Sequence, residues 1–323
     1  MNSNSILTVC IITYNHEDFI VNALESVLHQ ITDFNFQIVI ADDFSTDNTR
    51  DILEKYKSIY NDKITLIFQK ENVGAAKNWI DLLKYPKTKY TAYLEGDDYW
   101  LDNNKLQRQF DFLEKNNEFI LCASNSRMLL NSEFIDQPSS VKYNTDTFIK
   151  FENLIGDFFY NPIPTSTIMF RTYLIDNVDF NFIIKFGFTD WPLLVEISRF
   201  GKIYMFKDYF SVYRVHSNGV WTAKNKIEKK ISVLKFYFLI ADRYPKFDNL
   251  CRFQISNLID EIKEESNQYV EKFFKNKIDS ILTETKQRDY LKKNFSFKDI
   301  LVVLFKKLID KLSFFNYKKY KSY

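Results

Sequence analysis

Glycine, cysteine and net charge are all scarce in this chain of 323 residues, and each shortage excludes a class of protein. Only six glycines occur, and no two of them lie within ten residues of each other. The G-x-G-x-x-G turn of dinucleotide-binding proteins and the G-x-x-x-x-G-K loop of P-loop NTPases therefore do not occur in this sequence, which excludes both classes. Three scattered cysteines do not make a disulfide framework or a thiolate zinc site, so we expect a reducing compartment.

The 44 basic and 42 acidic residues leave a net charge of only +2. A protein that wraps nucleic acid neutralises many phosphates with Lys and Arg, so we expect no nucleic-acid partner. The longest uninterrupted apolar run, Ile300 to Phe305, is too short to span a bilayer, and the N-terminus lacks the basic region of a signal peptide. We therefore expect a cytoplasmic protein, either free or peripheral on the inner face of the plasma membrane.

The first 125 residues alternate between strand and helix patterns, which predicts an α/β fold with a mostly parallel sheet. Strands are expected at 7–13, 36–41, 64–69 and 90–94, and helices at 20–31, 48–60 and 75–83. Polar residues end these strands. Because ligands bind at the carboxyl ends of parallel strands, these polar residues are candidate site residues.

The remaining chain changes pattern twice. Residues 126–224 mix loops with expected strands at 167–171, 202–206 and 210–215, and a helix begins near Trp191. Everything beyond residue 226 has a helical pattern. We therefore divide the chain into a mixed α/β domain at 1–224, with halves 1–125 and 126–224, and a C-terminal helical region at 225–323.

Two groups of carboxylates follow expected strands. Glu95, Asp97 and Asp98 lie within four positions, and a divalent cation between them would offset their repulsion and bridge to phosphate oxygens. A solvated turn that caps the next helix is the alternative. Asp42 and Asp43 follow another strand, and a helix cap formed by the residues after them leaves these two carboxylates without a role.

Four motifs, in this order, make the chain resemble a family 2 glycosyltransferase of the GT-A fold, of the kind that builds bacterial surface polysaccharides. They are TVCIITYN at 8–15, IADDFSTD at 40–47, ENVG at 71–74 and EGDDYW at 95–100. The resemblance covers residues 5–221. It implies that residues 1–125 bind a nucleotide-sugar and that 126–224 bind the acceptor.

The resemblance implies a donor site for a nucleotide-diphospho-sugar, with UDP as the expected nucleotide. Tyr14 would line the base pocket, and Asp43 would hold the base or ribose. Asp97 and Asp98 would bind Mn²⁺ or Mg²⁺ together with the diphosphate. Glu95 stands where the family's Asp-x-Asp motif has its first Asp, so we rank it below the other two as a ligand.

Three further residues extend this donor site by resemblance. Arg214 and His216 match the family's Arg-x-His element, which places Arg214 at the donor and His216 at the metal. A structural histidine at a strand end is the alternative for His216. Lys77 either offsets the charge of the diphosphate or is a surface lysine on a helix.

The segment Phe188 to Pro192 resembles the place where the family has its catalytic Asp. Asp190 would then take the proton of the acceptor hydroxyl, and a helix N-terminus would keep its carboxylate ionised. The alternative is that Asp190 only caps the helix. Trp191 either stacks on the acceptor sugar or fills the core.

These features predict an inverting, metal-dependent, non-processive transfer to a hydroxyl of a glycan or of a lipid-linked oligosaccharide. Single-sugar transfer is favoured because the Gln-x-x-Arg-Trp element of processive synthases is absent. Two alternatives are a nucleotidyltransferase, which normally has a Gly-rich loop where this chain has Tyr14 to Glu17, and an inactive nucleotide-sugar-binding protein.

The last residues suggest a membrane contact. Residues 297–312 have apolar side chains at helical spacing, and residues 292–323 carry nine lysines against two aspartates. Such a segment, residues 297–323, is typical of a helix that lies on an anionic membrane surface. Packing against the α/β domain, or against a second copy in a homodimer, is the alternative.

Overall fold

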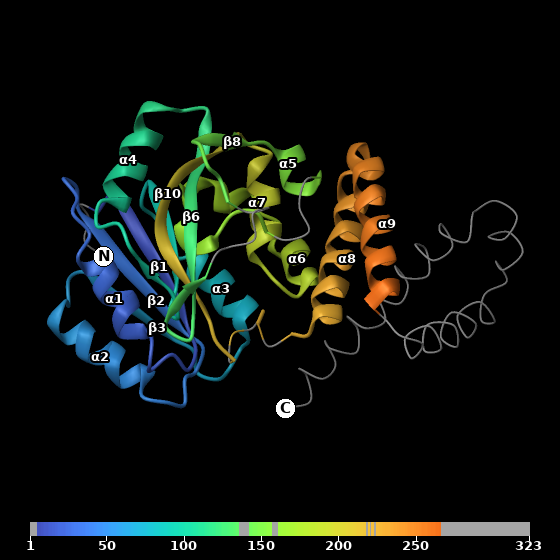
Figure 1. The fold of residues 1–323 in the computed structure, drawn as a ribbon. Helices are drawn as coiled ribbons and strands as arrows, with labels where there is room; N and C mark the ends of the chain where they lie inside the picture. The colour runs from blue at the N-terminus through green and yellow to red at the C-terminus, as the bar shows by residue number, and fades with distance from the viewer. Residues whose placement is uncertain are drawn as a thin grey trace, which may run out of the picture. The chain divides into compact units, whose positions relative to one another are not determined.

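The computed structural model describes residues 5–135, 142–156, 161–217, 219, 221–222 and 224–265 (Figure 1). The chain divides into two compact units, Met1–Ala223 and Lys224–Tyr323. In the described ranges, no helix combines the length and apolarity needed to cross a membrane. The expected amphipathic helix at 297–312 and the lysine-rich end lie outside the described residues.

The first unit is built on a ten-stranded sheet whose N-terminal half is parallel, as the sequence predicts. Four strands lie in the order β3-β2-β1-β4 and are all parallel. They are β1 (Leu7–Thr13), β2 (Phe36–Asp42), β3 (Ile64–Phe68) and β4 (Tyr90–Glu95). Ile12 pairs with Ala41 on one side and with Glu95 on the other, so the residues that follow these strands emerge at one edge.

The sheet continues through β9 (Met169–Arg171), β6 (Phe119–Leu130), β10 (Lys202–Val215) and β5 (Tyr99–Trp100). β9 is antiparallel to both of its neighbours, whereas β6 and β10 run parallel. The short strands β7 (Glu133–Ile135) and β8 (Thr147–Ile149) pair with β6 and β10. The two strands expected at 202–215 are one strand, because irregularities in register between Phe206 and Ser211 absorb the break in the pattern.

Helices cover both faces of the parallel half. Val9 and Ile11 of β1 pack into one apolar core with residues of α1 (Ile20–Leu28), α2 (Thr49–Ile59) and α4 (Lys105–Lys115). Cys10 points to the opposite face, where its Sγ lies 3.9 Å from the carbonyl oxygen of Leu82 in α3 (Ala75–Leu83). Figure 1 shows α1 and α2 on one side of the sheet and α3 on the other.

Helix α1 is shorter than the sequence predicts. We expected Ile31 on its buried face, but the helix ends at Leu28 and Ile31 is 62% exposed. The backbone leaves the helix because the amide of Ile31 donates to the carbonyl of Asn103, 2.8 Å away.

The second half of the first unit contains shorter elements. They are α5 (Phe151–Gly156), α6 (Phe180–Ile183), α7 (Asp190–Ser198) and the 3-10 helices η2 (Thr165–Thr167), η3 (Thr172–Asn177) and η4 (Ile184–Phe186). The second unit is helical in its described part, with α8 (Lys226–Arg243), η5 (Pro245–Phe247) and α9 (Asp248–Glu265). Its buried residues include Leu234, Tyr237 and Ile255, which lie on these two long helices.

Candidate functional site

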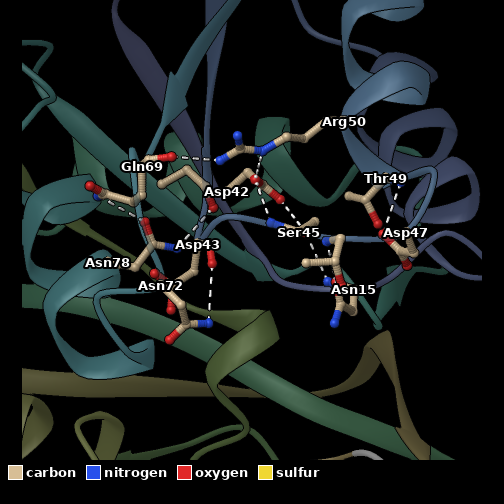
Figure 2. Close-up of polar contacts among 12 residues, drawn as sticks. Asn15, Asp42, Asp43, Ser45, Asp47, Thr49, Arg50, Gln69, Asn72 and Asn78 are labelled. Atoms are coloured by element: carbon tan, nitrogen blue, oxygen red, sulfur yellow. Dashed lines mark hydrogen bonds and ion pairs between the residues drawn. The ribbon is translucent and has the colours of Figure 1, made fainter. Parts of the chain in front are cut away.

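Two loops at the carboxyl edge, one after β1 and one after β2, are joined by hydrogen bonds (Figure 2). The amide of Asn15 donates to Ser45 Oγ at 2.8 Å, and Asn15 Oδ1 accepts from the amide of Thr46 at 2.8 Å. Asn15 adopts a φ of 53°, a left-handed conformation that Asn tolerates better than most residues. The two loops therefore form one polar wall.

Asp42 holds this wall in place rather than facing a ligand. Its buried carboxylate accepts the amide of Ser45 at 3.0 Å and pairs with Arg50 Nε at 2.5 Å. Arg50 also donates to the carbonyl of Gln69 at 2.7 Å, as Figure 2 shows. Its guanidinium lies over the rings of Phe44 and Phe68. Because burying an unpaired carboxylate is costly, the ion pair with Arg50 is what allows the Asp42 carboxylate to be buried.

Asp43 is the second carboxylate of this loop and is 2% exposed. Its Oδ1 accepts the amide of Val73 at 2.8 Å, and its carbonyl accepts from Asn72 Nδ2 (Figure 2). Burial raises the pKa of Asp43, and the amides of Val73 and Gly74 offset only part of that rise. Tyr14 lies on the loop after β1 and is 42% exposed.

The loop after β4 carries the acidic cluster. Asp97 Oδ2 lies 3.0 Å from His216 Nε2 and 3.8 Å from His16 Nε2. Asp98 Oδ1 accepts the amide of Arg214 at 2.9 Å, which ties this loop to β10. The Arg214 guanidinium in turn donates to the carbonyl of Asp97 at 2.8 Å. The cluster thus unites residues more than a hundred positions apart.

The three carboxyl groups titrate differently. Burial, and then the charges of neighbouring carboxylates, raise the pKa of Glu95 and of Asp98 well above their usual range. Burial also acts on Asp97, but the hydrogen bond from His216 and the charge of His16 outweigh it, so the pKa of Asp97 is lowered. Asp97 is therefore the carboxylate of this cluster that keeps its negative charge most readily.

A divalent cation suits the donor atoms of this cluster. Asp97 and His216 offer a carboxylate oxygen and an imidazole nitrogen, and buried Glu95 Oε2 has no hydrogen-bond partner. No set of three or more His, Cys, Asp or Glu residues is preassembled for a metal within the described part of the chain. Mg²⁺ commonly binds through one or two carboxylates and completes its shell with water and substrate phosphates. The residues fit a cation shared with a phosphate ligand, not a closed protein cage.

Asp190 is the first residue of α7, and Thr189 is its N-cap. The expectation that Asp190 caps the helix is therefore wrong by one residue. Its Oδ2 accepts from Asn161 Nδ2 at 2.7 Å and from Thr165 Oγ1 at 3.4 Å. Burial and the surrounding carboxylates, Asp190 among them, raise the pKa of Tyr213. The charge of Asp190 thus acts on the same region as the acidic cluster.

Two expected site residues are placed elsewhere. Trp191 is 1% exposed and its indole N–H donates to the carbonyl of Leu154 at 2.9 Å, so the ring fills the core and is not available to stack on an acceptor. Lys77 is exposed on α3 and pairs with Asp81 one turn later at 2.5 Å. This is the surface lysine that the sequence left open as an alternative.

His16 is the residue that the sequence did not single out. It reaches Asp97 because Gly96 allows close approach: a Cβ at position 96 would lie 2.9 Å from His16 Nδ1 and 3.0 Å from the carbonyl of Ile12. The available signal was its position directly after Tyr14-Asn15, at the end of β1. Asn161 and Arg50 gave no signal, because their partners are distant in sequence.

The fold is that of GT-A glycosyltransferases, judged by solved structures. S. aureus TarS in complex with UDP-GlcNAc superposes with a TM-score of 0.60 and 19% identity, covering 81% of this chain and 74% of that one. The mannosyltransferase PcManGT from Pyrobaculum calidifontis, in complex with GDP-Man and Mn²⁺, gives a TM-score of 0.57 and 13% identity, covering 94% and 86%.

Residues 8–176 match the model of the family described as Glycosyl transferase family 2. The chain therefore belongs to this family. An uncharacterised protein of Mycobacterium tuberculosis is 30% identical over 217 residues, 67% of this chain. The chain spans only 60% of that relative's length. The Escherichia coli protein WfaP, described as UDP-Glc:alpha-D-GlcNAc-diphosphoundecaprenol beta-1,3-glucosyltransferase, is 30% identical over 236 residues, 71% of this chain and 86% of its own.

Proposed function

We propose that this protein is an inverting, metal-dependent, non-processive glycosyltransferase of surface polysaccharide synthesis. It moves a sugar from a UDP-sugar to a hydroxyl of a glycan or of a lipid-linked oligosaccharide. The observation that carries the proposal is that Asp43, the Asp97–His216 pair and Asp190 belong to one unit, in which Asp43 and Asp97 follow the parallel strands β2 and β4. Family membership, together with the UDP-sugars named for WfaP and TarS, supports it.

The donor's nucleoside would bind along the wall formed by the two joined loops. The Asp43 carboxylate would accept a hydrogen bond from the base or ribose, and Tyr14 would lie beside the base. The wall is held rigidly by Asn15, Ser45 and the Asp42–Arg50 pair, so these groups are positioned before the ligand arrives.

Asp97, His216 and Glu95 are the residues that would hold Mn²⁺ or Mg²⁺, which would offset the charge of the diphosphate as it leaves. The sequence ranks Asp98 above Glu95 as a ligand, but Asp98 Oδ1 already accepts the amide of Arg214, so we propose a positioning task for Asp98 instead. Its bond to the amide of Arg214 fixes the loop, and the Arg214 guanidinium is held beside Asp97. This restraint keeps Asp97 in place relative to β10.

Asp190 would accept the proton of the acceptor hydroxyl while the hydroxyl oxygen attacks C1 of the donor sugar. The attack comes from the face opposite the diphosphate, so the anomeric configuration inverts and the proton ends on Asp190. Asn161 orients the carboxylate through its 2.7 Å hydrogen bond.

The experiment that tests the proposal compares Asp190→Asn with Asp176→Asn, which removes an exposed carboxylate elsewhere in the same unit. The assay follows label from radiolabelled UDP-glucose and UDP-N-acetylglucosamine to an undecaprenyl-diphosphate-linked GlcNAc acceptor. We expect Asp190→Asn to lose transfer by about 10²–10⁴-fold and to bind UDP as the wild type does. Equal transfer by the wild type and Asp190→Asn contradicts the role of Asp190, and UDP binding without transfer favours an inactive binding protein.

A further inference from the structure

A hollow of about 570 Å³ lies outside the site described above, over β5, β6, β7 and β10. It is an open depression of the surface and not an enclosed pocket, so a ligand bound there would stay partly exposed to solvent. The residues that line it include Arg127, Phe134 and Tyr209, together with Arg108 and Asp208. None of these residues takes part in the donor site or in proton transfer.

The hairpin between β6 and β7 places an aromatic ring over this hollow. Its two turn residues, Asn131 and Ser132, both have positive φ, 49° and 67°, which is the signature of a type I′ turn. Leu129 pairs with Phe134, so Phe134 lies diagonally from Arg127 on the same face. Phe134 is 51% exposed, so its ring is accessible to a ligand in the hollow.

Arg127 is held between two rings and keeps its hydrogen-bond donors. Its guanidinium carbon lies 5.3 Å from the centroid of Phe134 and 5.3 Å from that of Tyr209. Among the residues that the structure describes, Arg127 forms no ion pair. A stacked guanidinium presents planar donors in a fixed direction, so Arg127 is ready to bind a ligand oxygen.

The opposite wall supplies fixed acceptors. Arg108 bridges two carboxylates, Asp102 at 2.8 Å and Asp208 at 2.5 Å, and its guanidinium lies over the ring of Phe210. The register irregularity of β10 turns Asp208 and Tyr209 toward the hollow. The charged lining residues are two arginines and two aspartates, whose charges cancel, and Lys142 lies beside them with its ammonium 5.8 Å from the centroid of the Tyr209 ring.

The geometry points to a carbohydrate subsite that binds a neutral oligosaccharide segment of the acceptor, away from the sugar that receives the transfer. The exposed ring of Phe134 offers an apolar surface for the C–H face of a pyranose, and fixed guanidinium and carboxylate groups match its hydroxyls as donors and acceptors. The lining residues carry no excess of positive charge, which disfavours an anionic membrane or nucleic acid. This inference rests on the proposed function, since the ligand is part of the acceptor.

The position on β10 sets the length of that ligand. Tyr209 and Arg214 lie on the same strand, and the five residue steps from one to the other correspond to roughly 15 Å. Arg214 contacts the acidic loop, so the hollow lies more than the length of one sugar away from that loop. Only an oligosaccharide chain can reach from the hollow to the acidic loop. We therefore expect the subsite to select acceptors by the length of their sugar chain.

The test screens the full-length protein, without donor, against an array of neutral and acidic oligosaccharides and measures the affinity of the hits by calorimetry. We expect the wild type to bind neutral oligosaccharides of three or more residues, and Arg127→Ala and Phe134→Ala to lose at least ~10-fold in affinity. Phe134→Trp, which keeps a ring, should retain binding. Phe200→Ala is the matched control, because Phe200 is an exposed ring beside Arg199 outside the hollow.

Three results overturn the proposal: no neutral oligosaccharide binds, only acidic glycans bind, or the two alanine variants bind as tightly as the wild type. UDP affinity, measured on the same samples, separates the two proposals. If oligosaccharides bind at the hollow and UDP does not bind at all, the proposed function fails and the subsite stands. If UDP binds equally to all variants and oligosaccharides bind to none, only the subsite fails.

Discussion

Lys105 is a fully buried lysine below the acidic loop, and its titration gives a prediction that can be worked from the structure. Its ammonium donates to Gln109 Oε1 at 2.7 Å and lies 4.0 Å from the centroid of the Trp100 ring. Burial lowers its pKa from the usual 10.5 to about 7, and the nearby Cys122 and Asp102 offset little of this change. In the unfolded chain the same group keeps its ordinary pKa.

The sign of the effect follows from proton binding. Between pH 7 and pH 10.5 the unfolded chain binds a proton at Lys105 that the folded chain does not, so the free energy of unfolding rises with pH in this window. Below pH 7 Lys105 is protonated in both the folded and the unfolded chain, so the free energy of unfolding no longer depends on its titration. The folded chain then bears the full cost of burying the charge. The whole difference corresponds to about 5 kcal/mol, and the slope reaches at most about 1.4 kcal/mol per pH unit in the middle of the window.

The perturbation is Lys105→Met, which keeps the length of the side chain and removes the titrating group. The loss of the bond to Gln109 is the same at every pH, so only the pH dependence reports on Lys105. The assay is urea unfolding between pH 7 and 9.5, followed by tryptophan fluorescence. All four tryptophans, Trp79, Trp100, Trp191 and Trp221, lie in the first unit, so the signal reports on that unit.

We expect the wild type to gain stability relative to Lys105→Met by roughly 1 kcal/mol per pH unit. The matched control is Lys115→Met, which removes an exposed lysine from the same helix and should show no such slope. A constant difference between the wild type and Lys105→Met over the whole range refutes the assignment of a buried, largely neutral lysine.

Three further predictions concern the site and the chain end. Gly96→Ala should lower the free energy of unfolding by about 1–3 kcal/mol and weaken nucleotide binding, because the new Cβ displaces His16; an unchanged melting curve would contradict the close approach. Arg50→Met should lower it by about 3–5 kcal/mol, since Asp42 stays buried without a partner, and Arg50→Met with Asp42→Asn should recover part of that loss in urea unfolding. Deleting residues 297–323 should abolish flotation of the protein with anionic liposomes. Unchanged flotation would contradict the expected membrane contact. A change from dimer to monomer in light scattering would instead favour packing of this segment against a second copy.

The parallel half of the fold could be predicted because local pattern and tertiary environment agree there. Strand β1 lies between two other strands and has helices on both faces. Both of its faces are therefore buried, and a strand of this kind has an unbroken apolar run. Where long-range contacts decide, the sequence was less informative. The end of α1 depends on a backbone bond between Ile31 and Asn103, and a pattern of apolar residues cannot reveal it.

The same distinction applies to the site. Asp43 and Asp97 follow buried strands, and this position alone made them candidates. Whether Trp191 stacks on the acceptor or fills the core depends on the direction that the first turn of α7 faces, and the spacing of residues in the sequence does not determine that direction. The partners that set the local chemistry, Arg50 for Asp42 and Asn161 for Asp190, come from other segments, and only the folded structure brings them together.

The most direct test of the account is UDP binding, measured by thermal unfolding with and without Mn²⁺ in the wild type, Asp97→Ala and the exposed control Asp176→Ala. A ligand that binds only the folded state at 100 times its Kd adds about 2.7 kcal/mol to stability. The account predicts that UDP stabilises the wild type and Asp176→Ala when Mn²⁺ is present, and that Asp97→Ala loses this effect. No stabilisation by UDP with Mn²⁺, or the same stabilisation in Asp97→Ala, would contradict it.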